Sequence, residues 1–232
     1  MGVIVPQPYA SNKALGGAKL EGSAIFSASF KNVLSRTPDR CGDRRTWTWS
    51  GWLKPGFFDT SPFFGCIGSV QQTSIKWYIK MPEMGDGVGT QMIDWDSVAR
   101  EVGGWYHYVF VLDSSNDIEE DRQRLYVNGK RIVKSVTTFN SLVWPAQNYQ
   151  SSINEKGYQH QIGGRGDGAS QWMDGYMSEM NFLYGHASTA ASEFAFRDEL
   201  TGSWLPKKVD WRKSSSGTAV LNYYLNLSLI HI

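Results

Sequence analysis

The segment from 125 to 133 constrains the fold of this chain more than any other. Two short runs rich in strand-forming residues, 125–127 and 130–133, are separated only by Asn128 and Gly129. A two-residue hairpin loop of type I′ needs positive φ at both positions, and Asn-Gly is a pair that accepts this conformation. The segment therefore predicts an antiparallel β-hairpin with a tight turn.

Alternating apolar and polar residues predict further strands. Trp47 and Trp49 alternate with Thr and Ser, and residues 74–81 alternate in the same way, which is typical of strands with one solvated face. If residues 46–53 pair with 63–70 as a hairpin across 54–62, Cys66 falls beside Ser50. In 105–112 both faces are apolar or aromatic, which predicts a central strand covered on both sides. The remaining expected strands are 158–163, 175–184 and 218–227.

The strand pattern predicts an all-β fold of two packed antiparallel sheets. The only helix that we expect is a short one over 188–197. The chain has 232 residues, of which 14% are aromatic, 19% are charged and 24 are Gly, and a sandwich of this length forms a single domain. We therefore expect an N-terminal arm or linker over 1–19, poor in large apolar groups, followed by one β-sandwich over 20–227.

The overall charge and the apolar runs exclude several functional classes. The 23 basic and 22 acidic residues leave a net charge of +1, which argues against nucleic-acid binding through bulk charge. No run reaches the ~18 to 20 apolar residues of a membrane helix, and we identify no secretory signal. We expect Cys41 and Cys66 to be free thiols in a reducing compartment.

Three groups of segments together resemble the concanavalin A-like, or laminin-G-like, jelly-roll family. They are Thr-Trp-Thr-Trp-Ser-Gly-Trp-Leu-Lys at 46–54, the strand 104–113 followed by Arg-Leu-Tyr-Val-Asn-Gly-Lys at 124–130, and 162–164 followed by 173–180. Their order and spacing match the family pattern over roughly 160 residues, although each piece alone is mostly strand composition. The resemblance implies a two-sheet jelly roll.

Further segments are similar to structural proteins of tailed bacteriophages common in marine viral sequence. These segments are 34–38, 42–50, 165–168, 174–184 and 200–207. The resemblance implies a virion component such as a tail, fibre or decoration protein, made in the host cytoplasm and contacting other virion proteins, itself, or a host-surface glycan. Residues 228–232 depart from the pattern, and we expect them to be a non-native tail translated from adapter sequence, in which case the natural protein is longer.

The carboxylates do not match the enzymes built on this jelly roll. Such glycoside hydrolases carry Glu-x-Asp-x-x-Glu on one strand, because one carboxylate acts as nucleophile and another as acid. Glu119 and Asp121 begin such a run, but Arg124 stands at the last position. We therefore expect a solvated loop over 113–121 and no enzyme activity. The alternative is a glycan hydrolase whose catalytic residues are unrecognised.

The sequence predicts no cofactor, with calcium as the open alternative. Related jelly rolls bind calcium at their rim, and the conceivable ligands here are Asp113, Asn116, Asp167 and Asp174. Asp94 and Asp96 point to the same side of a strand, but two carboxylates fall short of the six to eight oxygens that calcium takes. The four histidines are scattered, and we expect His107 to be a satisfied sheet histidine rather than a ligand or base.

The segment 139–172 is the candidate binding face, because its aromatic residues are interspersed with turn residues. Aromatic faces stack on sugar rings while polar neighbours bind the hydroxyls. The predicted ligand-binding residues are Trp144, Tyr149, Tyr158, Arg165, Asp167 and Trp172. The competing interpretation is that these rings pack over one end of the sandwich. The predicted role is a non-enzymatic adhesion or structural module; a purely architectural subunit remains the second alternative.

Overall fold

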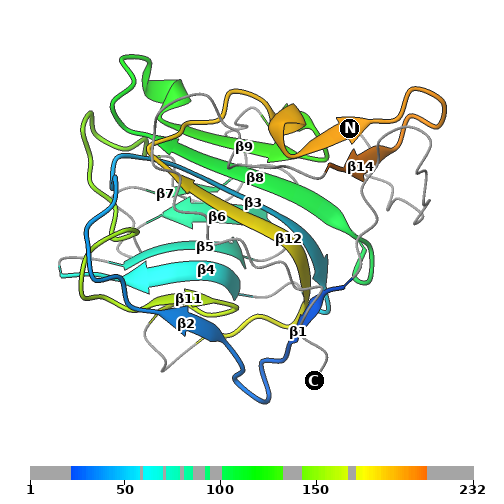
Figure 1. Cartoon of the computed structure of the whole chain (residues 1–232), viewed down its shortest axis with the longest axis horizontal. Coiled ribbons are helices and arrows are strands. Elements are labelled where there is room, and N and C mark those ends of the chain that lie inside the picture. The colour runs from blue at the N-terminus through cyan, green and yellow to red at the C-terminus, as the bar shows by residue number, and fades with distance from the viewer. Residues whose placement is uncertain are drawn as a thin grey trace.

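Two six-stranded antiparallel sheets pack face to face, and a two-stranded ribbon lies outside them (Figure 1). This computed structural model describes residues 22–57, 60–69, 72–78, 81–85, 92–94, 101–132, 143–166 and 171–207. The predicted arm 1–19, the predicted strand 218–227 and the tail 228–232 lie outside the described residues. The all-β, two-sheet antiparallel sandwich of jelly-roll type is confirmed.

The first sheet, sheet A, holds the long strands. In spatial order it consists of β1 (Ala24–Phe26), β12 (Gly175–Tyr184), β3 (Thr46–Pro55), β8 (Tyr106–Asp113), β9 (Gln123–Val127) and β10 (Lys130–Ile132). The predicted hairpin is confirmed, because Val127 pairs with Lys130 and the φ angles of Asn128 and Gly129 are 47° and 82°. The predicted central strand is confirmed as β8, which lies between β3 and β9.

The second sheet, sheet B, differs from the sequence interpretation at one strand and at one pairing. In spatial order it consists of β2 (Leu34–Arg36), β11 (His160–Ile162), β4 (Ser61–Ile67), β5 (Gln72–Tyr78), β6 (Met81–Gly85) and β7 (Met92–Asp94). The predicted strand 74–81 is two strands, because Tyr78 pairs with Met81 and the chain reverses between them. The conditional hairpin of 46–53 with 63–70 does not form, because β3 and β4 belong to opposite sheets.

Aromatic packing across the core explains why β3 and β4 separate. Trp49 on β3 faces Phe63 on β4 with ring centroids 5.5 Å apart, so the strands bury their aromatic faces against each other rather than side by side. A bulge in β4 after Pro62 lets both Phe63 and Phe64 enter the core. As a consequence Cys66 is paired with Thr73 and His160, and not with Ser50.

A cover segment, residues 186–207, packs on the outer face of sheet A. It contains η3 (Ala191–Glu193), β13 (Ala195–Arg197) and β14 (Trp204–Pro206), and it forms a second apolar cluster with side chains of sheet A that include Trp52, Val109, Val111 and Tyr126. The predicted helix over 188–197 is therefore wrong beyond one 3-10 turn. Phe194 and Ala195 bury their side chains against the sheet, and β13 pairs with β14.

The part of the chain described by the structure contains two 3-10 turns. One is η3, and the other is η2 (Glu119–Asp121), which lies in the connection between β8 and β9. Within the described residues no helix has the length and apolar character needed to cross a membrane.

The tip of the β9–β10 hairpin supports the cover segment, which gives a test of the packing. A Cβ atom on Gly129 would lie 2.6 Å from the Trp204 ring, whereas one on Gly157, which also has a φ of 82°, would meet nothing within 4 Å. We expect Gly157→Ala to cost about 1 kcal/mol of unfolding free energy through backbone strain, and Gly129→Ala about 2 kcal/mol or more. Urea unfolding measures both values. Equal losses would contradict the contact with Trp204.

Candidate functional site

Three of the predicted binding aromatics pack against the core. Trp144, Tyr149 and Tyr158 are half-buried and contact the main apolar cluster. The carbonyl of Tyr149 accepts a 2.6 Å hydrogen bond from the hydroxyl of Ser114, beside the end of β8. The carbonyl of Tyr158 accepts one from His160 at the start of β11. These contacts match the interpretation in which the rings pack over an end of the sandwich.

The backbones of Trp172 and Arg165 lie close to each other in the fold. Trp172 forms an isolated antiparallel bridge with Gly164, the residue that precedes Arg165. The backbone of Arg165 crosses β4, because a Cβ on Gly65 would lie 2.6 Å from the Arg165 carbonyl oxygen. Asp167 lies outside the described residues. The structure thus brings together two of the six predicted binding residues.

The four conceivable calcium ligands do not form one site. Asp113 pairs with Thr46 at one end of β3, whereas Asp174 precedes Gly175, which pairs with Pro55 at the other end. Nine strand positions correspond to roughly 30 Å. The Asp113 carboxylate also accepts hydrogen bonds from Ser115 and Asn116. Among the described residues no group of three or more His, Cys, Asp or Glu side chains is placed to hold a metal ion.

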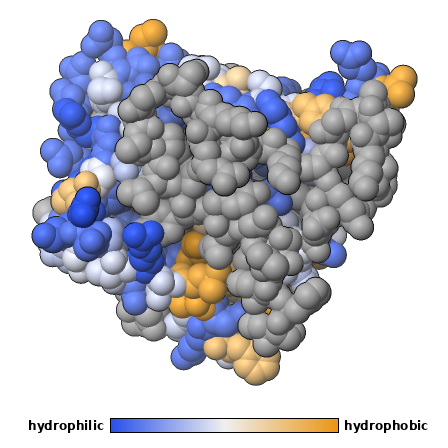
Figure 2. All heavy atoms as spheres, viewed as in Figure 1, coloured by the Kyte–Doolittle hydropathy of each residue, from blue (hydrophilic) through white to orange (hydrophobic). Residues whose placement is uncertain are grey.

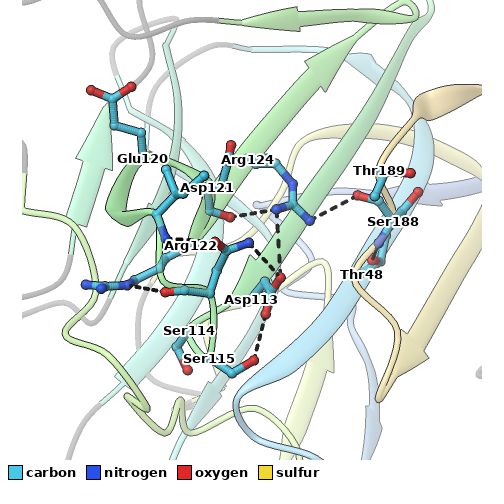
Figure 3. Close-up of polar contacts among 12 residues, drawn as sticks. Thr48, Asp113, Ser114, Ser115, Glu120, Asp121, Arg122, Arg124, Ser188 and Thr189 are labelled. Carbon is cyan, nitrogen blue, oxygen red and sulfur yellow. Dashed lines mark hydrogen bonds and ion pairs between the residues drawn. The ribbon is translucent and has the colours of Figure 1, made fainter.

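A buried arginine occupies the position where a hydrolase of this type would have its second glutamate. Arg124 donates from Nη1 to the Asp121 carbonyl at 2.7 Å and from Nη2 to the Ser188 carbonyl at 3.2 Å (Figure 3). Its Nη1 also lies 3.9 Å from the Asp113 carboxylate. Through these hydrogen bonds Arg124 connects β9 to the η2 loop and to the cover segment.

Two buried histidines have lowered pKa values because burial disfavours their charged form. Trp204 donates its indole N–H to Nδ1 of His107 at 3.0 Å, so the ring proton lies on Nε2, 2.9 Å from the Ser50 hydroxyl. Burial lowers the pKa of His107 to about 3. His160 accepts from the Asn154 amide, and burial lowers its pKa as well. The prediction of a satisfied sheet histidine at 107 is confirmed.

The half-buried histidine of the cover segment is not arranged for nucleophilic catalysis. The Glu193 carboxylate contacts both the His186 ring, at 2.7 Å, and the Ser188 hydroxyl, also at 2.7 Å. A nucleophilic serine needs the imidazole next to its hydroxyl as a base, but here the carboxylate stands between them. The hydrogen bond with Glu193 raises the pKa of His186. The pair links η3 to the residues before it within the cover segment.

Three of the exposed apolar and aromatic side chains, Ile25, Phe30 and Tyr176, lie at or beside one edge of sheet A. We call this the edge surface, and it consists of Ile25, Phe30, Lys31, Lys54, Trp172 and Tyr176. Ile25 and Lys54 both pair directly with Tyr176, one from each side. Asn32 holds the following turn closed by accepting from the Ser27 amide at 2.6 Å and donating to the Ile25 carbonyl at 2.9 Å.

Phe30 and Tyr176 make the edge surface accessible, whereas Trp172 is half-buried. Phe30, in the turn after β1, is 86% exposed, and Tyr176 is 37% exposed. Figure 2 shows an apolar group at the lowest point of this view, where Figure 1 places the turn that follows β1. Sequence reasoning identified Trp172 but missed Tyr176, Lys31 and Lys54. An irregularity between Ser178 and Asn181 interrupts the alternation of β12, so the outer position of Tyr176 follows from its pairing with Ile25 and Lys54 and not from the pattern alone.

No family model matches the chain, and no curated protein matches it by sequence. Similar solved structures include a heptameric SAP-like pentraxin from Limulus polyphemus, with 20% identity over 67% of this chain and 70% of the pentraxin, and a TM-score of 0.47. The mouse laminin alpha1 LG4-5 fragment has 11% identity over 95% of this chain and 50% of the fragment, with a TM-score of 0.46.

A third similar structure is the enzymatically active domain of tailspike protein 2 from bacteriophage CBA120. Its identity is 12% over 80% of this chain, with a TM-score of 0.49, and the chain spans 28% of the tailspike domain. The assignment of the fold rests on the strand order described above.

The buried histidine makes stability depend on pH. Because the folded pKa of His107 is about 3 and the unfolded value is near 6.5, unfolded chains bind the proton first as pH falls through this window. His107 therefore contributes full stability above about pH 6.5, and up to ~1.4 kcal/mol is lost per pH unit below it. Urea unfolding between pH 7 and 4 should show a shallower decline for His107→Gln than for the wild type. Parallel curves would contradict this assignment.

The two thiols should react differently. Cys41 is exposed and Cys66 is buried in the core, where burial raises the pKa of the thiol to about 12. We expect a disulfide reagent such as dithionitrobenzoate to modify one thiol per folded chain and two in denaturant. The Cys41→Ser variant should show no reaction while folded. A second reactive thiol in the folded wild type would exclude the observed burial of β4.

Proposed function

We propose that this chain is a non-enzymatic binding module of a virion. In this proposal the sandwich is a rigid scaffold, and the edge surface contacts a glycan on a host surface or a neighbouring subunit. The observation that carries the proposal is that reactive side chains are engaged inside the fold while side chains of the edge surface are exposed. His107, Glu193 and Arg124 are engaged by hydrogen bonds inside the fold, whereas Phe30 and Tyr176 of the edge surface are exposed.

Aromatic side chains on a rigid edge suit sugar recognition. A ring face buries the C–H surface of a sugar, while polar neighbours bind its hydroxyl groups. Trp172 and Tyr176 lie four residues apart, and their backbone is anchored by the bridge to Gly164 and by the pairing of β12 with β3. Such anchoring favours binding, because little loop ordering is required when the ligand arrives.

The carboxylates support the non-enzymatic part of the proposal. Glycoside hydrolysis needs two carboxyl groups that flank the scissile bond. Glu155 pairs with Arg44 at 3.2 Å and accepts from the Ser69 amide and hydroxyl. Asp121 pairs with Arg131, and Glu193 is held by His186 and Ser188. Release of reducing sugars from algal or bacterial polysaccharides by the purified protein would favour the hydrolase alternative instead.

The virion part of the proposal rests on the segments that resemble tailed-phage structural proteins. Among them, 42–50 begins β3, 174–184 contains β12, and 200–207 contains β14. These segments therefore supply strands of sheet A and of the cover segment. Binding of the purified protein to other virion proteins of the source phage would test this part directly.

A glycan array followed by titration tests the edge surface. We expect Trp172→Ala and Tyr176→Ala each to weaken binding of the best array ligand by about tenfold, the typical effect of an aromatic hot spot. Leu200→Ala, which removes an 81% exposed side chain from the turn between β13 and β14, should leave the affinity unchanged. Circular dichroism checks that each variant is folded.

Two outcomes would contradict the proposal. Unchanged affinity in both ring variants would remove the edge surface from the binding site. An array without any bound glycan, combined with retained self-assembly or capsid binding, would favour a purely architectural subunit.

A further inference from the structure

Two rings of the edge surface each have a lysine above them. The ammonium of Lys31, from the turn after β1, lies 4.8 Å from the centroid of the Trp172 ring. The ammonium of Lys54, from β3, lies 5.4 Å from the centroid of the Tyr176 ring. Different elements supply the two lysines, so the same ring-and-cation arrangement is built twice along one edge.

The two arrangements are close enough to bind one ligand. Trp172 and Tyr176 are four residues apart, which corresponds to at most ~13 Å of extended chain. The edges of β1 and β12 join them, because Phe26 pairs with Gly175 and its ring packs against Gly163, next to the residue that bridges to Trp172. The backbone positions that carry the two rings therefore lie within the span of a short oligosaccharide.

Among the described residues around these rings, basic side chains predominate. Lys31, Lys54 and Arg165 lie on or beside the edge surface, and the described acidic residue between the two rings is Asp174, whose carboxylate lies against Gly56. The whole chain is nearly neutral, with 23 basic and 22 acidic residues, so this local excess is not a consequence of overall charge. A positive strip of this kind attracts anionic ligands.

The lysines also change which sugars the rings accept. A neutral sugar that stacks on the covered face must first displace the lysine, and the cation–π attraction is then lost. An acidic sugar keeps the ammonium in place, because its carboxylate or sulfate group forms a charge-assisted hydrogen bond with the lysine while its C–H surface contacts the ring. We propose that the edge surface prefers acidic glycans over neutral ones, an inference that rests on the proposed function.

Chemically matched polysaccharides test this preference. Oligogalacturonides and their methyl esters share a backbone and differ in charge, and sulfated carrageenan oligosaccharides can be compared with agarose oligosaccharides. By calorimetric titration at low salt, we expect the acidic member of at least one pair to bind about tenfold more tightly, as two exposed cation–π contacts would give. The preference should fall as the salt concentration rises.

Lysine variants separate specific recognition from general charge. Lys31→Met and Lys54→Met keep an apolar stem without the charge and should reduce the preference, whereas Lys31→Arg should retain it. Lys130→Met, which removes an exposed charge from β10, is the matched control and should have no effect.

Each other outcome overturns the inference. Equal binding of acidic and neutral members, with loss of both in Trp172→Ala, would leave the proposed function in place but refute the acidic preference. Equal sensitivity to Lys130→Met, or equally tight binding of single-stranded DNA, would indicate general charge attraction. Absence of binding to all four glycans and to the array would refute both proposals.

Discussion

Burial of sheet A on both faces is the constraint on which the rest of the structure depends. Its inner face packs against sheet B through rings such as Trp49, Phe63 and Phe110, and its outer face packs under the cover segment through Trp52 and Trp204. A strand covered on both sides has no solvated face, so its polar groups need partners within the protein. The hydrogen bonds of His107 to Ser50 and Trp204 meet this requirement on the outer face.

The same constraint determines what remains for function. Arg124, which sequence spacing aligns with a catalytic glutamate, lies under the cover segment and binds backbone carbonyls of Asp121 and Ser188. His107 is neutral near neutral pH, because burial lowers its pKa to about 3. Beyond the cover segment, the outer face of sheet A is exposed at the β1 edge, where Ile25, Lys54 and Tyr176 form one cross-strand row. The cover segment buries the centre of sheet A and leaves its β1 edge exposed, so the same packing leaves this edge for recognition.

Sequence reasoning succeeded where local chemistry decides the structure. The Asn128-Gly129 turn follows from backbone preference, and the strand over 175–184 follows from strand-forming composition, both of which act over neighbouring residues. Sequence reasoning did not decide the pairing of 46–53 with 63–70, because two aromatic strands can lie side by side or face each other across a core with the same alternation. It failed for 188–197 because tertiary packing of Phe194 overrides a weak helical preference.

The sequence alone determined the fold class, the tight hairpin, the central position of β8 and the absence of the hydrolase carboxylate motif, since these depend on residue type and short-range order. Only the tertiary structure decided which aromatics are accessible. Trp144, Tyr149 and Tyr158 have the composition of a binding face but pack on the core, whereas Tyr176 and its lysine meet through pairing between strands more than 100 positions apart in sequence. The physical reason is that exposure and cross-strand contact depend on how the sheets stack, which local sequence patterns do not record.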